Sequence, residues 1–408
     1  MSLIHDGTNP GDATGKTRLA VHKAAAIKSH HLGVDSPINP RSNEGMHDSS
    51  STSKAHSAGP LSGVRVIDLS AVVSGPMAAV MLADQGAEVI KIEPPGWGDG
   101  IRGLGASRNG VSAIFSMINR NKKSVALNLK TEVGRQLVKE LIGTADVVLQ
   151  NYRPGKMARL GLDYETLKNV YPELIYLSIS GMGDEGPYAQ QKVYDYVIQG
   201  MSGILDAQGE AEDYAMVRTI LYDKVTSLTA AQAMTAALFA RERGAGGQHI
   251  ELTMLDAALY FNWPDLMWNE SFEGDGVAKA GDLADLYEVS RTKDGAIVSH
   301  RLNGACDDYG TEELIDLFAA NEIPVGRVNR RADLISDPQI KARRSLLRFE
   351  HPIAGTMIQP RSPARFSQTE TPLNDPSPEV GEHTAALLMD LGYSMETLIT
   401  WAREGALG

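Results

Sequence analysis

The chain has 408 residues, 42% of them hydrophobic and 22% charged, which is enough for one large core or for two domains. Its net charge of -12 argues against broad electrostatic binding to nucleic acid or to an anionic membrane, and no apolar run reaches the roughly 20 residues that span a bilayer. The single cysteine, Cys306, rules out an internal disulfide framework and fits a reducing cytoplasm.

The first 58 residues differ in composition from everything that follows them. They contain no Phe, Tyr or Trp, and they end in a run rich in serine. Such a segment buries too little apolar area to offset its ordering entropy, so we expect residues 1–58 to be a disordered tail. The segment also lacks the hydrophobic centre of a secretory signal.

Strands and helices alternate from residue 63 onward. A strand at 63–69, a helix at 77–85 and a strand at 88–93 form a βαβ unit, which is the signature of a parallel sheet. The same pattern continues with a strand at 124–129, a helix at 131–143, and strands at 146–152 and 174–179. The predicted fold is therefore α/β, with a doubly wound, mainly parallel, Rossmann-like sheet.

Three loops follow strand ends, where ligands gather in such sheets. Residues 70–76 place free backbone amides at a helix start, a place for a phosphate or carbonyl, although a plain tight turn explains them equally well. Residues 151–161 carry Arg153, Lys156 and Arg159, which fit either bound phosphates or a solvated helix face. Residues 181–188 are rich in glycine. No loop has the dinucleotide or P-loop fingerprint, so NAD and ATP are weakly supported.

The stretch at residues 221–243 brings a carboxylate, Asp223, to the start of an alanine-rich helix, and a strand at 248–254 follows. On local chemistry alone, Asp223 is more often an N-cap, because aspartate accepts an unpaired helix amide. The alternative is a carboxylate nucleophile that the helix terminus keeps ionised.

The rest of the chain suggests a second, smaller α+β domain. We predict an aromatic helix at 254–269, bent or interrupted at Pro264, and a hairpin around the Asp-Gly pair in 286–299. A helix at 311–320, a polar helix at 333–347, an extended stretch at 360–378 and a last helix from residue 381 follow. The predicted domains are a large α/β domain at 59–272, a small domain at 283–347, and a C-terminal segment at 348–408 that returns to the large domain.

Several motifs, in this order and spacing, resemble one family along nearly the whole chain after the tail. They are residues 63–70 with Gly75-Pro76, then 82–93, 119–124, 127–130, 146–155, 181–188, the Asp223 helix with 246–254, and Gly381-Glu-His-Thr. Together they resemble the class III coenzyme A transferases (CaiB/BaiF type). This family includes formyl-CoA transferase, carnitine-CoA transferase and α-methylacyl-CoA racemase.

The resemblance implies the chemistry and the ligands. Asp223 matches the family's catalytic aspartate, which carries CoA through a mixed anhydride and an aspartyl-CoA thioester. The turn with Val72, Val73 and Ser74 resembles the one that lines CoA. Positions that contact CoA in the family are occupied here by Leu127, Asn151, Tyr152, Arg159, Lys192 and Met254. The implied substrates are an acyl-CoA and a small carboxylic acid, with CoA as part of the substrate, no tightly bound cofactor and no metal. The implied assembly is an interlocked homodimer.

Departures from the family pattern narrow the function. The racemases use a histidine where this chain has Tyr194, and a phenol of pKa near 10 is a poorer two-way proton shuttle at neutral pH. Formyl-CoA transferase has a glutamine at the position of Val73 and a tetraglycine loop that has no counterpart here, which weighs against formyl-CoA or oxalate as substrate. The small domain is also shorter than usual. A CoA-transferase is favoured. A racemase and a non-catalytic CoA-binding protein remain as alternatives, and a nicotinamide dehydrogenase is more distant.

Overall fold

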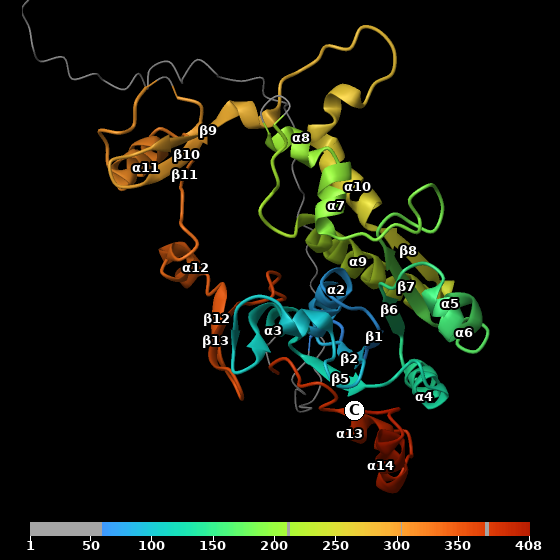
Figure 1. Cartoon of the computed structure of the whole chain (residues 1–408). Coiled ribbons are helices and arrows are strands. Elements are labelled where there is room, and N and C mark those ends of the chain that lie inside the picture. Colours follow the sequence, from blue (N-terminus) through green and yellow to red (C-terminus); the bar gives the residue numbers. More distant parts are fainter. Residues whose placement is uncertain (1–58, 210–212, 303, 372–374) are drawn as a thin grey trace, which may run out of the picture. The chain divides into compact units, whose positions relative to one another are not determined.

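The computed structural model describes residues 59–209, 213–302, 304–371 and 375–408, so the predicted tail at 1–58 lies outside the described residues. The described residues form two compact units, one of residues 280–331 and one of residues 59–279 and 332–408 (Figure 1). The domain boundaries predicted from the sequence stay predictions.

The larger unit is built on a six-stranded sheet with the strand order β5-β2-β1-β6-β7-β8. Every neighbouring pair in this sheet is parallel. The strands are β1 (Arg65–Asp68), β2 (Glu88–Glu93), β5 (Lys122–Ala126), β6 (Val147–Gln150), β7 (Ile175–Ser180) and β8 (His249–Thr253). The predicted α/β class with a mainly parallel sheet is confirmed.

Helices cover both faces of this sheet because successive strand residues point to opposite sides. Val66 of β1 packs in a core cluster with α2 (Ser74–Ala83), α9 (Leu221–Ala240) and α10 (Met254–Leu266). The next residue, Ile67, packs in a second cluster with α4 (Glu132–Ile142), α13 (Thr384–Asp390) and α14 (Met395–Arg403). α10 runs two residues past Pro264, so the break expected at that proline comes at its end, before the short turn η3 (Trp268–Glu270).

The C-terminal residues return to the edge of the sheet. The Thr384 side chain accepts a hydrogen bond from the Ala126 amide at 3.0 Å, and Leu407 bridges to Leu127 just after β5. Figure 1 shows α13 and α14 in red beside this edge strand. Several elements were not predicted, among them the turn η1 (Gly100–Gly103), the short helix α3 (Ala113–Asn119) and the helices α7 (Asp195–Met201) and α8 (Ile204–Gln208).

The polar helix predicted at 333–347 is wrong in its second half. The chain forms η5 (Asp333–Ile335) and α12 (Pro338–Ala342), and then turns at Arg344, whose φ is +50°. It continues as an antiparallel hairpin of β12 (Leu346–His351) and β13 (Gly355–Pro360). The side chains of β12 alternate between more and less buried, as in a strand. The basic residues just before β12 obscured this alternation in the sequence.

The smaller unit has a three-stranded antiparallel sheet in the order β11-β10-β9. Its strands are β9 (Tyr287–Arg291), β10 (Ala296–His300) and β11 (Val325–Arg327). The β9–β10 hairpin around the Asp-Gly pair is confirmed. The helix α11 (Thr311–Ala320) closes its core with Leu314 and Phe318 against Ile297 and Cys306.

Candidate active site

A cavity of about 220 Å³ opens where β1, β6, β7 and β8 end. It brings together Asp223 and six of the other residues that the sequence singled out. Those six are Val72, Ser74, Asn151, Tyr152, Lys192 and Met254. Tyr194 and the glycine-rich loop, through Gly181, line the same cavity. The end of the sheet therefore collects side chains that are up to 182 positions apart, from Val72 to Met254.

Asp223 is the third residue of α9, which begins at Leu221 after the N-cap residue Ile220. The interpretation of Asp223 as an N-cap is therefore wrong. The first-turn amides are accepted instead by Asp195, whose Oδ1 lies 2.6 Å from the Tyr222 nitrogen and 3.1 Å from the Asp223 nitrogen. Because a second carboxylate caps the helix, the Asp223 carboxylate stays turned to the cavity.

Asp195 is the functional residue that sequence reasoning missed. It is the first residue of α7 (Asp195–Met201), is 5% exposed, and also accepts a hydrogen bond from Gln199 Nε2 at 2.7 Å. An aspartate in the first turn of a helix is ordinary, so nothing local marks it. Its importance comes from a contact across 28 positions.

Two causes raise the pKa of Asp223 to about 6. The larger is loss of solvent around the carboxyl group, and the second is the nearby negative charge of Asp195. Hydrogen bonds from the Ser74 amide and hydroxyl act in the opposite direction and favour the charged form. The carboxylate is therefore more basic than an ordinary aspartate yet still mostly ionised at pH 7, which suits a nucleophile.

The loop after β1 forms one wall of the cavity and is held by side chains from elsewhere in the fold. The Asn151 side chain binds Ala71 at two points, with Oδ1 accepting from its nitrogen at 2.9 Å and Nδ2 donating to its oxygen at 2.7 Å. Ser227 of α9 donates to the Ser74 oxygen at 2.8 Å. These bonds tie the wall to β6 and to the helix that carries Asp223.

Three predicted residues do not line this cavity. Val73 packs in an apolar cluster with Ile101 and Phe115, and Leu127 packs in the core beside α13. Arg159 is exposed on the short helix α5 (Lys156–Leu160). The side chains of Val73 and Leu127 belong to the core because of their places in the chain. Val73 directly precedes α2, and Leu127 directly follows β5.

Cations stand near the cavity mouth. The Lys156 ammonium lies 3.8 Å from the centre of the Tyr152 ring, and that of Lys192 lies 5.3 Å from the Tyr194 ring. Within the described ranges, Lys156, Arg159 and Lys192 form no ion pair with an acidic side chain. The positive charge of these three groups is therefore open to an anionic ligand.

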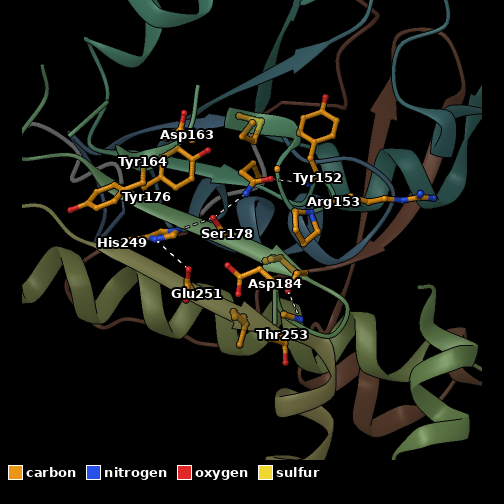
Figure 2. Close-up of a pocket in the computed structure, with 18 of the residues that line it drawn as sticks. Tyr152, Arg153, Asp163, Tyr164, Tyr176, Ser178, Asp184, His249, Glu251 and Thr253 are labelled. Atoms are coloured by element: carbon orange, nitrogen blue, oxygen red, sulfur yellow. Dashed lines mark hydrogen bonds and ion pairs between the residues drawn. The ribbon is translucent and has the colours of Figure 1, made fainter. Parts of the chain in front are cut away.

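A second cavity, of about 440 Å³, shares Tyr152 and Arg153 with the first (Figure 2). Figure 2 shows Ser178 pointing toward His249, with Oγ and Nε2 2.9 Å apart. Ser178 also accepts from Gln150, whose Oε1 in turn accepts from the Tyr152 amide at 2.8 Å. This chain of hydrogen bonds fixes the backbone of the residue between the two cavities.

Comparison with known proteins decides the family. The model of CoA-transferase family III matches residues 61–301 and 291–384. The chain belongs to CoA-transferase family III. Like its relatives, this family III CoA-transferase is an enzyme that uses CoA thioesters, and the sequence-based assignment is confirmed.

Its relatives act on different acids. The family III CoA-transferase is 34% identical to the succinate–glutarate CoA-transferase of Agrobacterium fabrum, over 81% of this chain and 96% of the relative. It is also 34% identical to the acetyl-CoA:oxalate CoA-transferase of Acetobacter aceti, over 82% and 97%. A solved CaiB/BaiF family protein from Brucella suis has a TM-score of 0.72 at 30% identity and covers 82% of this chain and all of its own. No helix in the described part of this chain is long and apolar enough to cross a membrane.

Proposed function

We propose that this family III CoA-transferase uses Asp223 as a nucleophile to move CoA from an acyl-CoA to a small carboxylic acid. The observation that carries the proposal is the Asp223 carboxylate, which faces the cavity because Asp195 caps its helix. A carboxylate with a pKa of about 6 combines basicity with ionisation at neutral pH.

The reaction runs in four balanced steps. The Asp223 carboxylate attacks the donor thioester carbonyl and expels CoA thiolate, which leaves a mixed anhydride of the aspartate and the donor acid. The thiolate then attacks the aspartyl carbonyl and releases the donor acid, so an aspartyl-CoA thioester forms. The acceptor carboxylate attacks that thioester to make a second anhydride and thiolate. Attack of the thiolate on the acceptor acyl group yields the new acyl-CoA and restores Asp223.

The residues around Asp223 bind CoA and stabilise charge in this proposal. Val72, Asn151, Tyr152 and Met254 form the cavity walls. The Ser74 amide and hydroxyl, which favour the charged form of the Asp223 carboxyl group, are placed to donate to the oxyanion that develops on the attacked carbonyl. Lys192 and Arg159 supply positive charge for the CoA phosphates. Val73 and Leu127 support, through their core packing, the loops to which they belong.

The acceptor that we propose is a small dicarboxylate. The names of the relatives include succinate, glutarate and oxalate. Succinate and glutarate are the first acids to test, because Val73 and the missing tetraglycine loop weigh against oxalate. Tyr194 lines the cavity at the position where the racemases carry a histidine, and its phenol is the weaker proton shuttle at neutral pH. Transfer is therefore favoured over epimerisation.

We further propose a cytoplasmic homodimer. An apolar groove of about 1060 Å³ runs between α2 and α9 and is lined by Leu228 and Phe239, both of which are exposed in the single chain. An apolar groove of this size is typical of a surface covered by another protein. The single cysteine fits a reducing compartment.

The test traps the covalent intermediate. The enzyme is incubated with succinyl-CoA, quenched with hydroxylamine or borohydride, and digested for mass spectrometry. Modification at Asp223, together with CoA transfer to glutarate, is the expected result. Asp223→Asn should abolish both signals, and Asp206→Asn, an exposed carboxylate outside the cavity, should abolish neither. A modified peptide elsewhere, with none at Asp223, would refute the assignment.

A second incubation of the same enzyme separates transfer from epimerisation. Incubation of a 2-methylacyl-CoA in deuterated water reports exchange at the α carbon. Deuterium uptake without CoA transfer to any acid would instead identify a racemase. Transfer without deuterium uptake is the outcome that we expect.

A further inference from the structure

Val72 has a backbone conformation that its residue type disfavours. Its φ is +68°, in the left-handed region that glycine adopts freely. A β-branched residue is an outlier there, and such a conformation persists only where the surrounding structure enforces it. The residue lines the Asp223 cavity and is 39% exposed, so burial of its own side chain does not hold it in place. Other groups must do so.

The Asp99 carboxylate holds the Val72 amide directly. The Val72 nitrogen lies 3.1 Å from Oδ1 and 3.2 Å from Oδ2 of Asp99, which is 4% exposed. Asp99 lies in the loop after β2, and it is 27 positions from Val72 in the sequence. Two hydrogen bonds set the position of Asp99 itself. Its backbone nitrogen donates to Glu93 Oε2 at 2.9 Å, and its Oδ1 accepts from the Ile101 nitrogen at 3.1 Å.

Lys91 completes the support from the other side of the turn. Its ammonium lies 2.9 Å from Asp99 Oδ2 and donates to the Ser70 oxygen, also at 2.9 Å. Both side chains of this ion pair are about 1% exposed. Asp68 and Glu93 also favour the charge of Lys91, and within this buried cluster the Lys91–Asp99 pair holds residues 70 and 72 on either side of Ala71.

The conformation of Val72 affects Asp223 through Ser74, which lies two positions further along the chain. Ser74, whose amide and hydroxyl favour the charged form of the Asp223 carboxyl group, lines the same cavity as Asp223, follows directly on this turn and begins α2. A shift of Val72 toward an ordinary conformation would rotate the next peptides and move those donors. Displacements of about 1 Å at a catalytic group cost up to roughly a hundredfold in rate.

We propose that Asp99 and Lys91 are positioning residues, which hold Val72 in the left-handed conformation and thereby place the Ser74 donors against Asp223. The inference rests on the proposed role of Asp223 for its kinetic readout. It assigns a function to a buried ion pair that touches neither the cavity nor, in the proposed reaction, any reacting atom.

A double-mutant cycle between positions 99 and 72 tests the proposal. Asp99→Asn keeps the size of the side chain but removes the charge, and it should slow acylation of Asp223 by roughly tenfold or more. Val72→Gly allows φ of +68° without strain, so the loop needs less support. In the double variant, Asp99→Asn should therefore cost at least threefold less than it does beside Val72. Equal costs in both backgrounds would overturn the proposal.

Asp84→Asn is the matched control. Asp84 also forms a buried ion pair, with Arg120 at 2.5 Å, but it contacts a different part of the larger unit. Its effect should be the same with Val72 and with Gly at position 72. Coupling of equal size at Asp84 would show that the glycine acts on general stability, and would also overturn the proposal.

Two further measurements do not depend on turnover, and the second needs no variant. Titration calorimetry with CoA on the same four proteins should show the same coupling in affinity. A protein that binds CoA but transfers nothing would refute the proposed function, and the affinity coupling would still decide the roles of Asp99 and Lys91. In the unmodified enzyme, the Val72 amide should exchange with solvent at least a hundredfold more slowly than an open loop amide. Fast exchange there would refute the bond to Asp99.

Discussion

Asp223 lies at a helix N-terminus that another residue caps. Asp195 accepts the amides of that terminus and, by its charge, helps to keep the Asp223 pKa raised. The two carboxylates thus have separate roles that follow from their surroundings. One is tied to three donors, from Tyr222, Asp223 and Gln199, and the other faces a cavity. Asp195 is occupied by its three donors, so Asp223 is the carboxylate that can act on a ligand in the cavity.

Replacing Asp223 should trade activity for stability. A carboxyl group whose pKa is raised on folding binds protons more tightly in the folded state, so its contribution falls as pH rises from its unfolded value of 3.8 through about 6. At pH 7, Asp223→Asn should therefore raise the free energy of unfolding by roughly 1–3 kcal/mol. It should also lower transfer by a thousandfold or more. Urea unfolding at pH 7 and pH 4 checks the first effect, which should vanish at the lower pH.

Replacing Asp195 should move the acidic limb of the pH–rate profile. Transfer should fall as pH drops through about 6, because protonation of Asp223 removes the nucleophile. Asp195→Asn removes a negative charge that raises this pKa, so the limb should shift to lower pH. The measurement is kcat/KM for loss of the thioester between pH 4.5 and 8. A limb that stays in place or moves upward would contradict the assigned electrostatics.

The critical element is the turn between β1 and α2. Its backbone groups are bonded by Asn151, Lys91 and Asp99, so the turn takes its shape from three different strands or loops. Residue 75 must also approach Ser70 closely. A Cβ on Gly75 would lie 2.2 Å from both Cβ and Oγ of Ser70, which is far inside contact distance. Glycine is needed here for space rather than for φ.

Gly75→Ala should therefore displace the turn. We expect a loss of roughly 1–3 kcal/mol in the free energy of unfolding, as for overpacking elsewhere, and CoA affinity at least tenfold weaker. Thermal unfolding and calorimetry with CoA measure the two effects. Gly103→Ala serves as the control, because a Cβ there meets no atom within 4 Å. Comparable effects at both glycines would mean that crowding against Ser70 is not the cause.

At the scale of the whole molecule, the match to the family is divided. The two matched segments overlap at residues 291–301, which belong to the hairpin of the smaller unit. The described part of that unit has three strands and the helix α11. The larger unit, by contrast, contains every predicted site residue. The residues proposed for the reaction therefore all belong to the larger unit.

The proposed homodimer predicts the effect of charge in the apolar groove. Leu228→Glu together with Phe239→Glu should shift the protein to monomer, because the dimer would then bury two carboxylates per chain. Light scattering after size-exclusion chromatography measures the mass. Val170→Glu is the control, since Val170 is 65% exposed and does not line the groove. An unchanged mass for the double variant would place the subunit contact elsewhere.

The sequence by itself determined the alternation of strands and helices, the parallel sheet and, by resemblance, the family, and it singled out Asp223 as the candidate nucleophile. Those features depend on hydrophobic periodicity and on motifs within short windows, which survive in one dimension. Only the tertiary structure decided that Asp195 rather than Asp223 caps α9, that Val73 and Leu127 serve the core, and that Asp99 and Lys91 hold a strained valine. These features depend on contacts between residues some 20 to 30 positions apart or more. Parallel strands bring the ends of such distant segments together, and no local pattern in the sequence records the contacts.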